Sequence, residues 1–257
     1  MCAGLLGTLA VSGETPGGAP GRQEGVVSAA DADEPPQPEP PPLNAGAVLA
    51  GTLERLPTSP VTLRGEMIVR RQRGVVLRQV PFAIHLDWGA PEPRAEYRLS
   101  DSFGRVEERI TAIRQSDGSS LLTWHREDGT PATNPPALSD PVRDTDLTWL
   151  DLTLAFLWWP GATLAGEADF RGSLCDIVQV VPPTPLPGCG AMRLWIDRRL
   201  RFLRQAEQLD EDGTTVRRMW VSRVGKIGER WMIRDMEVER PGAGQRTKLH
   251  VEDLDTP

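Results

Sequence analysis

The sequence predicts a mainly β fold of the α+β class, with one antiparallel sheet of about eleven strands and two short helices. Segments in which apolar and polar residues alternate follow one another from residue 61 to residue 254, with one tryptophan-rich interruption. No helix long enough to connect parallel strands lies between consecutive segments, so neighbouring strands should be antiparallel. A sheet of that size tends to curl, which predicts a curved sheet rather than a flat one.

Composition and charge exclude several classes of protein. The 257 residues are 39% hydrophobic and 25% charged, which provides enough apolar material for a core. The formal charge of −7 gives no basic surface for a phosphate backbone, so we expect no nucleic-acid partner. Three cysteines are too few for a disulfide scaffold. No segment reaches the roughly 18–20 consecutive apolar residues of a membrane-spanning helix, so we expect no transmembrane span.

The start of the chain differs in composition from the rest. Residues 1–13, MCAGLLGTLAVSG, have the small and apolar residues of the later part of a signal peptide but no basic residues before them. Two interpretations stay open, a remnant of an export signal and a disordered start. Cys2 stands where a lipoprotein carries its acylated cysteine, although the apolar residues that precede such a cysteine are absent. Residues 14–42 are rich in Pro, Gly and acidic residues and are expected to form a disordered linker.

The folded domain is expected to span residues 43–257 as a single unit. Its first element is a short helix over residues 44–56, which Asn44 can cap and Pro57 ends. Strands follow, and Asp-Gly pairs between several of them favour tight reversals. The expected strands cover residues 61–69, 75–88, 94–100, 105–114 and 119–126, then 162–172, 174–181, 191–197, 201–210, 214–225, 230–239 and 245–254.

The tryptophan-rich interruption, DTDLTWLDLTLAFLWWPG at residues 144–161, is expected to form a second short helix over residues 148–157. Thr148 can cap this helix, and Pro160 ends it. Apolar residues occupy most of its circumference, and Asp151 is expected to mark its outer face. A short helix this apolar must be covered nearly all round, by the sheet, by neighbouring segments or by a ligand.

The order of these pieces carries a resemblance to a known family. TDLTWLDLTLAFLWWPG, then GSLCDIVQV, MRLWID, a hairpin around Asp212-Gly213 and the terminal strand QRTKLHVEDL resemble the bacterial outer-membrane lipoprotein-sorting family, the LolA/LolB-like proteins. The match covers residues 144–254, and strand order supports it over residues 43–143. The resemblance implies a strongly curved antiparallel sheet that forms an unclosed barrel, with short helices covering its mouth.

The resemblance also implies a function. It implies binding of acyl chains of lipids or lipoproteins in an apolar cavity between the sheet and a helical lid, for lipoprotein sorting or lipid transport. The implied location is the periplasm or the periplasmic face of the outer membrane. The implied partners are lipid acyl chains or lipidated proteins, with other envelope transport proteins as further candidates. No cofactor and no covalent chemistry are implied, and the lack of a coiled-coil pattern makes us expect a monomer.

The apolar pattern of the second helix supplies the candidate cavity residues. For each of them two interpretations stay open, cavity lining and ordinary core. The candidates are Trp149, Phe156, Leu157 and Trp158, followed by Leu150, Leu154 and Trp159.

Enzymatic function has little support in the sequence. His85, His125 and His250 lie in separate predicted strands without metal-ligand spacing, and no serine has the context of a nucleophile elbow. We therefore expect no catalytic residue and no metal. The alternative to a lipid carrier is an envelope protein-interaction or stress-sensing domain that uses the same fold as a docking surface and has a filled interior.

Overall fold

The computed structural model describes residues 44–71, 74–126, 128–227 and 230–255. The predictions for residues 1–13 and 14–42 lie outside the described residues. The elements run in the order α1 (Ala45–Leu53), β1 (Val61–Arg71), β2 (Val76–Asp87), β3 (Arg94–Ser100), β4 (Val106–Arg114), β5 (Ser120–His125), α2 (Trp149–Thr153), η2 (Ala155–Trp158), β6 (Thr163–Phe170), β7 (Ser173–Val180), β8 (Ala191–Asp197), β9 (Leu203–Leu209), β10 (Thr215–Ile227), β11 (Arg230–Glu239) and β12 (Gln245–Asp255).

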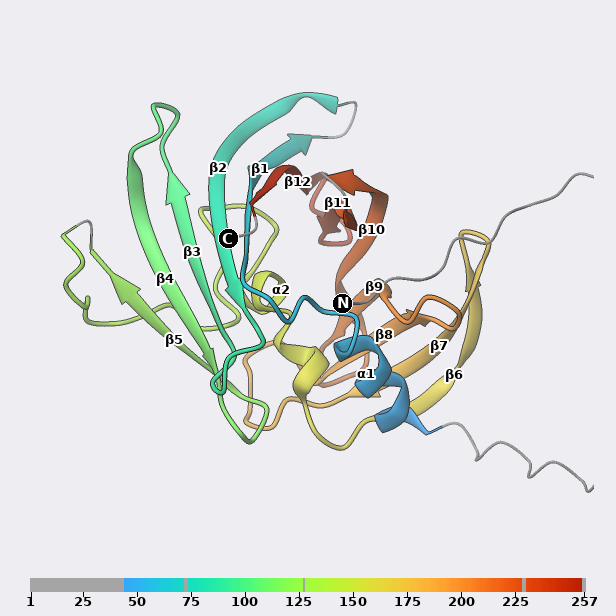
Figure 1. Cartoon of the computed structure of the whole chain (residues 1–257). Helices are drawn as coiled ribbons and strands as arrows, with labels where there is room; N and C mark the ends of the chain where they lie inside the picture. Colours follow the sequence, from blue (N-terminus) through green and yellow to red (C-terminus); the bar gives the residue numbers. More distant parts are fainter. Residues whose placement is uncertain (1–43, 72–73, 127, 228–229, 256–257) are drawn as a thin grey trace, which may run out of the picture. The chain divides into compact units, whose positions relative to one another are not determined.

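Within the described ranges, the twelve strands form one sheet in the order β5-β4-β3-β2-β1-β12-β11-β10-β9-β8-β7-β6. Every neighbouring pair is antiparallel. The strands β5 and β6 are the two edges, so the sheet does not close on itself. Figure 1 shows the sheet bending around α2, with the β2–β5 half on one side and the β6–β9 half on the other. The predicted mainly β fold and the unclosed curved sheet are confirmed, and each of the twelve expected strand ranges corresponds to one strand.

The hydrophobic core lies on the concave face of this sheet. Strand residues alternate between the two faces, so every second side chain points inward. In β3 these are Ala95, Tyr97 and Leu99, and in β8 they include Leu194 and Ile196, all buried. The inward residues of the two halves form one cluster together with α1, α2 and η2. The core therefore depends on the helices as well as on the sheet.

The two helical segments differ from their predicted lengths. The first is shorter than expected, and Asn44 caps it by accepting a hydrogen bond from the backbone N–H of Ala47 at 2.7 Å. The second is not the continuous helix predicted over residues 148–157. It ends at Leu154, whose φ of 48° is left-handed, and a turn of 3₁₀ helix follows. The carbonyls of Leu152 and Thr153 accept hydrogen bonds from strand side chains, which accounts for the break.

Candidate functional site

The candidate site is the Trp-rich segment, residues 144–161, where it packs on the concave face of the sheet. All seven predicted cavity residues belong to the hydrophobic core or pack against it. Five of them are buried, and two are partly buried. The buried ones are Trp149, Leu150, Phe156, Leu157 and Trp159, and the partly buried ones are Leu154 and Trp158. In this conformation the segment fills the space between the two halves of the sheet with its own side chains.

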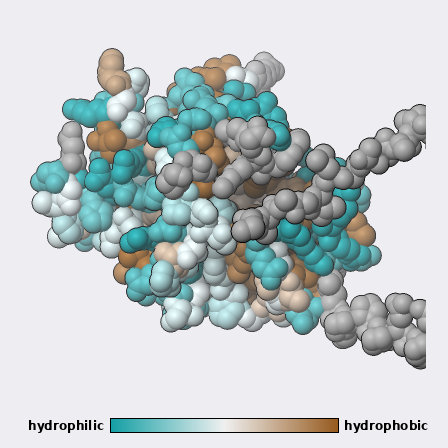
Figure 2. All heavy atoms as spheres, viewed as in Figure 1, coloured by the Kyte–Doolittle hydropathy of each residue, from teal (hydrophilic) through white to brown (hydrophobic). Residues whose placement is uncertain are grey.

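Aromatic rings join the segment to the sheet. Trp149 meets the inward ring of Tyr97 edge to face, with ring centroids 5.6 Å apart. Trp158 meets Trp88 in the same way at 5.8 Å. Both arrangements place the positive edge of one ring against the negative face of the other, which is a favoured geometry for aromatic pairs. The visible surface in Figure 2 is mostly hydrophilic, with apolar side chains in small separate groups.

Asp151 is buried, so the prediction that it marks the outer face is wrong. Its side chain is 1% exposed and lies 3.2 Å from the guanidinium of Arg217 on β10. Its other oxygen accepts hydrogen bonds from the backbone N–H of Thr148 at 2.8 Å and from the hydroxyl of Thr148 at 3.1 Å. The carboxylate therefore caps the start of α2, as a capping box does, and also pairs with a cation of the sheet. A charge inside an apolar core requires such a partner.

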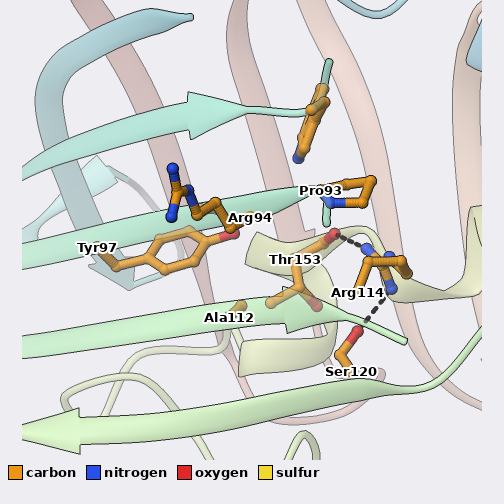
Figure 3. A pocket seen from close by; sticks show the side chains of 9 residues that line it. Pro93, Arg94, Tyr97, Ala112, Arg114, Ser120 and Thr153 are labelled. Carbon is orange, nitrogen blue, oxygen red and sulfur yellow. Dashed lines mark hydrogen bonds between the residues drawn. The ribbon is translucent and has the colours of Figure 1, made fainter. Parts of the chain in front are cut away.

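The break after α2 is held by two side chains from the sheet. Tyr97 donates its hydroxyl to the carbonyl of Leu152 at 3.0 Å. Arg114, at the end of β4, donates to the carbonyl of Thr153 at 3.2 Å and to the hydroxyl of Ser120 at 2.5 Å (Figure 3). Burial lowers the pKa of Arg114 to about 10 and raises the pKa of Tyr97. The guanidinium of Arg114 also lies 4.0 Å from the ring centre of Trp158, within the range of a cation–π contact.

A small hollow lies beside these contacts. Its volume is about 10 Å³, which is room for about one water molecule. Its lining comes from the sheet and the Trp-rich segment: Trp88, Pro93, Arg94, Ala95, Tyr97, Ala112, Arg114, Ser120 and Thr153 (Figure 3). The hollow is too small for an acyl chain in this conformation.

The start of the Trp-rich segment is fixed to the hairpin between β11 and β12. The buried carboxylate of Asp146 accepts from the hydroxyl of Thr247 at 2.9 Å, from Gln245 at 3.2 Å and from Arg240 at 3.3 Å. The backbone N–H of Asp146 donates to the Thr247 hydroxyl at 2.8 Å. One end of the segment is therefore held by polar contacts, while its centre is held mainly by apolar ones.

Sequence reasoning missed Arg114 and Arg217, two of the cations that contact the segment. In both β4 and β10 the sequence places a basic residue in the row of side chains that faces the core. Arg114 continues the inward row of Ile110 and Ala112, and Arg217 precedes the inward Met219. A basic residue in an inward row requires a buried partner, and backbone carbonyls or a carboxylate opposite the strand can provide one.

The metal-ligating side chains of the described residues are dispersed. Among them, no group of three or more His, Cys, Asp or Glu side chains is placed to hold a metal ion. The histidines are separate, with His85 against Thr62, His125 against Thr123 and His250 against Asp235. None of the helices in the described ranges is long and apolar enough to cross a membrane.

Comparisons with known proteins concern the fold. A family model described only as an uncharacterized protein matches residues 133–256. No curated protein sequence matches the chain. Among solved structures, a domain described as that of an outer membrane lipoprotein-sorting protein from Vibrio parahaemolyticus is 11% identical with a TM-score of 0.70, over 82% of this chain and 92% of that one.

Two further solved structures resemble the fold of this chain to a similar degree. A DUF1329 family protein from Desulfovibrio piger is 17% identical with a TM-score of 0.67, and the match covers 82% of this chain and 92% of that one. A LolA superfamily protein from Nitrosomonas europaea is 11% identical with a TM-score of 0.63, over 84% of this chain and 94% of that one. At these identities the likeness concerns the fold alone.

Proposed function

We propose that this chain, which has a LolA-like fold, binds acyl chains of lipids or lipidated proteins between the concave sheet and the Trp-rich segment. It would do so in the periplasm or at the periplasmic face of the outer membrane, in lipoprotein sorting or lipid transport, with other envelope transport proteins as partners. The observation that carries the proposal is the placement of the segment. A mostly apolar segment with a break at Leu154 fills the inside of a sheet whose edges are not bonded to each other.

The binding step follows from this placement. In the conformation described above, the segment itself occupies the space that an acyl chain would take. When the segment moves away, the apolar side chains on both sides of that space become available to the ligand. Each buried CH₂ group contributes roughly 0.8 kcal/mol, so a chain of about sixteen carbons gains on the order of 10 kcal/mol. This gain offsets the lost packing between the segment and the sheet.

The seven predicted residues have roles in this step. Trp149, Phe156, Leu157 and Trp158 would form the surface that the acyl chain contacts first, and Leu150, Leu154 and Trp159 would extend it. Release would occur when the segment closes again on the sheet, because its own apolar residues then replace the ligand. Such a cycle uses no cofactor and makes or breaks no covalent bond.

A fluorescent acyl probe tests this proposal directly. The full chain is expected to bind the probe, and palmitate is expected to displace it. Trp158→Gln should weaken probe binding about tenfold, because the partly buried ring loses its apolar contact. Phe103→Gln is the matched control, since Phe103 is 93% exposed at the β3–β4 turn. Absence of probe binding by the wild-type chain would overturn the proposal.

A second function is favoured by the filled interior. A protein-interaction domain with this fold needs no cavity, and the seven residues would then be ordinary core. Native mass spectrometry on the protein taken from an envelope fraction separates the two functions. A lipid mass supports the carrier, while a stoichiometric protein partner without lipid supports the docking domain.

A further inference from the structure

A polar cluster lies inside the otherwise apolar concavity, around Arg217. Arg217 sits near the start of β10 and is 7% exposed, on the same face as the core residue Met219. Two further polar residues belong to the cluster. Asp151 of the Trp-rich segment pairs with Arg217 across the interior, and Gln208 is the residue directly opposite Arg217 on β9.

The hydrogen bonding of this cluster is incomplete. The Nη2 atom of Arg217 lies 3.2 Å from Asp151 Oδ1, but the contact is an ion pair without a hydrogen bond, and this buried nitrogen has no hydrogen-bond partner. Gln208 donates to the carbonyl of Gly188 at 2.6 Å, while its Oε1 is buried without a partner. Buried polar atoms are nearly always hydrogen-bonded, so these two atoms at one register position are available to a further polar group.

Opening of the segment changes the charge balance of the interior. Arg217 belongs to the sheet and stays, while Asp151 belongs to the segment and leaves with it. The guanidinium would then face an apolar cavity without a counter-ion, which is strongly unfavourable. A neutral acyl ester leaves that charge unpaired. A carboxylate or a phosphate on the ligand restores the pair, in the bidentate geometry that a guanidinium favours.

We propose that the ligand of this cavity is an anionic amphiphile, whose carboxylate or phosphate takes the place of Asp151 on Arg217. This inference rests on the proposed function and adds the class of head group to it. Since Arg217 lies close to the β9–β10 turn, the head group sits at this end of the sheet and the acyl chain extends into the core. The Oε1 atom of Gln208 can accept a hydrogen bond from a hydroxyl or amide of the same head group.

A series of ligands with one chain and different head groups tests the inference on the wild-type protein. Laurate, dodecyl phosphate, dodecanol and dodecyltrimethylammonium are each titrated against a fluorescent acyl probe bound to the full chain, and displacement of the probe measures their affinities. Laurate and dodecyl phosphate are expected to bind at least tenfold more tightly than dodecanol, and the cation most weakly. The ratio between the two anions tells whether the site prefers a carboxylate or a phosphate.

The outcomes separate the two proposals. Equal affinity for laurate and dodecanol would overturn the anionic ligand while leaving acyl binding in place. No binding of any member of the series would overturn acyl binding itself.

Variants of Arg217 and Asp151 test whether these residues cause the preference for anionic head groups. Arg217→Met should abolish the preference for anions while dodecanol binding remains, and Arg217→Lys should keep part of this preference.

Asp151→Asn should tighten anion binding, because the competing carboxylate is gone while an amide can still cap α2. Arg218→Met is the matched control, since Arg218 is the next residue, on the other face, paired with Glu207. An anion preference that survives in Arg217→Met overturns the assignment. If Arg217→Met does not fold, Asp151→Asn and the wild-type series decide.

Discussion

At the scale of single residues, three side chains of the sheet provide the polar contacts at the centre of the Trp-rich segment. Tyr97 and Arg114 hold the carbonyls of Leu152 and Thr153, which a continuous helix would have used internally. Arg217 neutralises Asp151, so that a capping carboxylate can lie inside the core. These partners come from strands far away in the sequence. A local pattern predicted the cap at Thr148 but could not reveal the burial of the residue that completes it.

The first prediction concerns Arg114. Arg114→Met removes the donor to the Thr153 carbonyl and the cation over the Trp158 ring, and it leaves a carbonyl without its donor. The free energy of unfolding should fall by about 1–3 kcal/mol, as measured by urea denaturation. Arg94→Met is the control, because Arg94 lies on the neighbouring strand with a side chain that is 63% exposed. Equal stability of the two variants would contradict a holding role for Arg114.

At the scale of elements, the turn between β4 and β5 acts as a support for η2. Gly118 lies in this turn with a φ of +83°, and a Cβ atom there would lie 2.4 Å from the carbonyl oxygen of Trp158. The Asp-Gly pair at residues 117 and 118 predicted the chain reversal. The sequence did not reveal that Gly118 also leaves space for the backbone of Trp158, because that contact forms only when the chain has folded.

The second prediction uses two glycines of equal backbone conformation. Gly104 has the same φ of +83°, but a Cβ atom added there would have no other atom within 4 Å. Gly104→Ala should cost only the left-handed strain, roughly 1–2 kcal/mol. Gly118→Ala should cost about 1–3 kcal/mol more, because the Trp-rich segment must shift. Thermal unfolding of both variants measures the difference, and equal melting temperatures would show that the turn does not support η2.

The second helix shows where sequence reasoning reaches its limit. Its existence, its start and its end near Pro160 follow from local chemistry. Its interruption does not, because leucine rarely adopts the left-handed conformation of Leu154, and only contacts with the sheet stabilise it there. The same holds for the site. The apolar pattern identifies the residues that face inward, but whether they meet a ligand or the core depends on the position of the whole segment.

At the scale of the whole molecule, the strand order makes the inner strands of the sheet more resistant to local opening than its two edge strands. Strands β1 and β12, near the middle of the sheet, have hydrogen-bonded neighbours on both sides, while β5 and β6 have one neighbour each. The Trp-rich segment belongs to the connection between these two edge strands and packs on the concave face. The parts that would move under the proposed function therefore lie at the open side of the sheet, next to its edge strands.

The third prediction follows from this distribution. In hydrogen exchange, the amides of β1 and β12 should exchange most slowly, and those of β5, β6 and the Trp-rich segment faster. Adding an acyl ligand should change exchange in the Trp-rich segment while leaving β1 and β12 unaltered. Mass spectrometry of peptic fragments measures both effects. Slower exchange at the sheet edges than at its centre would contradict the proposed location of the movement.

The pairing of β1 with β12 has a consequence for synthesis. The first strand of the domain receives its central neighbour only when the last strand has been made, since Val69 pairs with Thr247 and Arg71 with Gln245. Until then the nascent chain carries the half-sheet β1–β5 and an apolar segment with three tryptophans that the later strands do not yet cover. Contacts so distant in sequence form slowly, and exposed apolar surface favours aggregation in the meantime. The late pairing of β1 with β12 therefore leaves apolar surface of the first half of the sheet exposed until the last strand has been made.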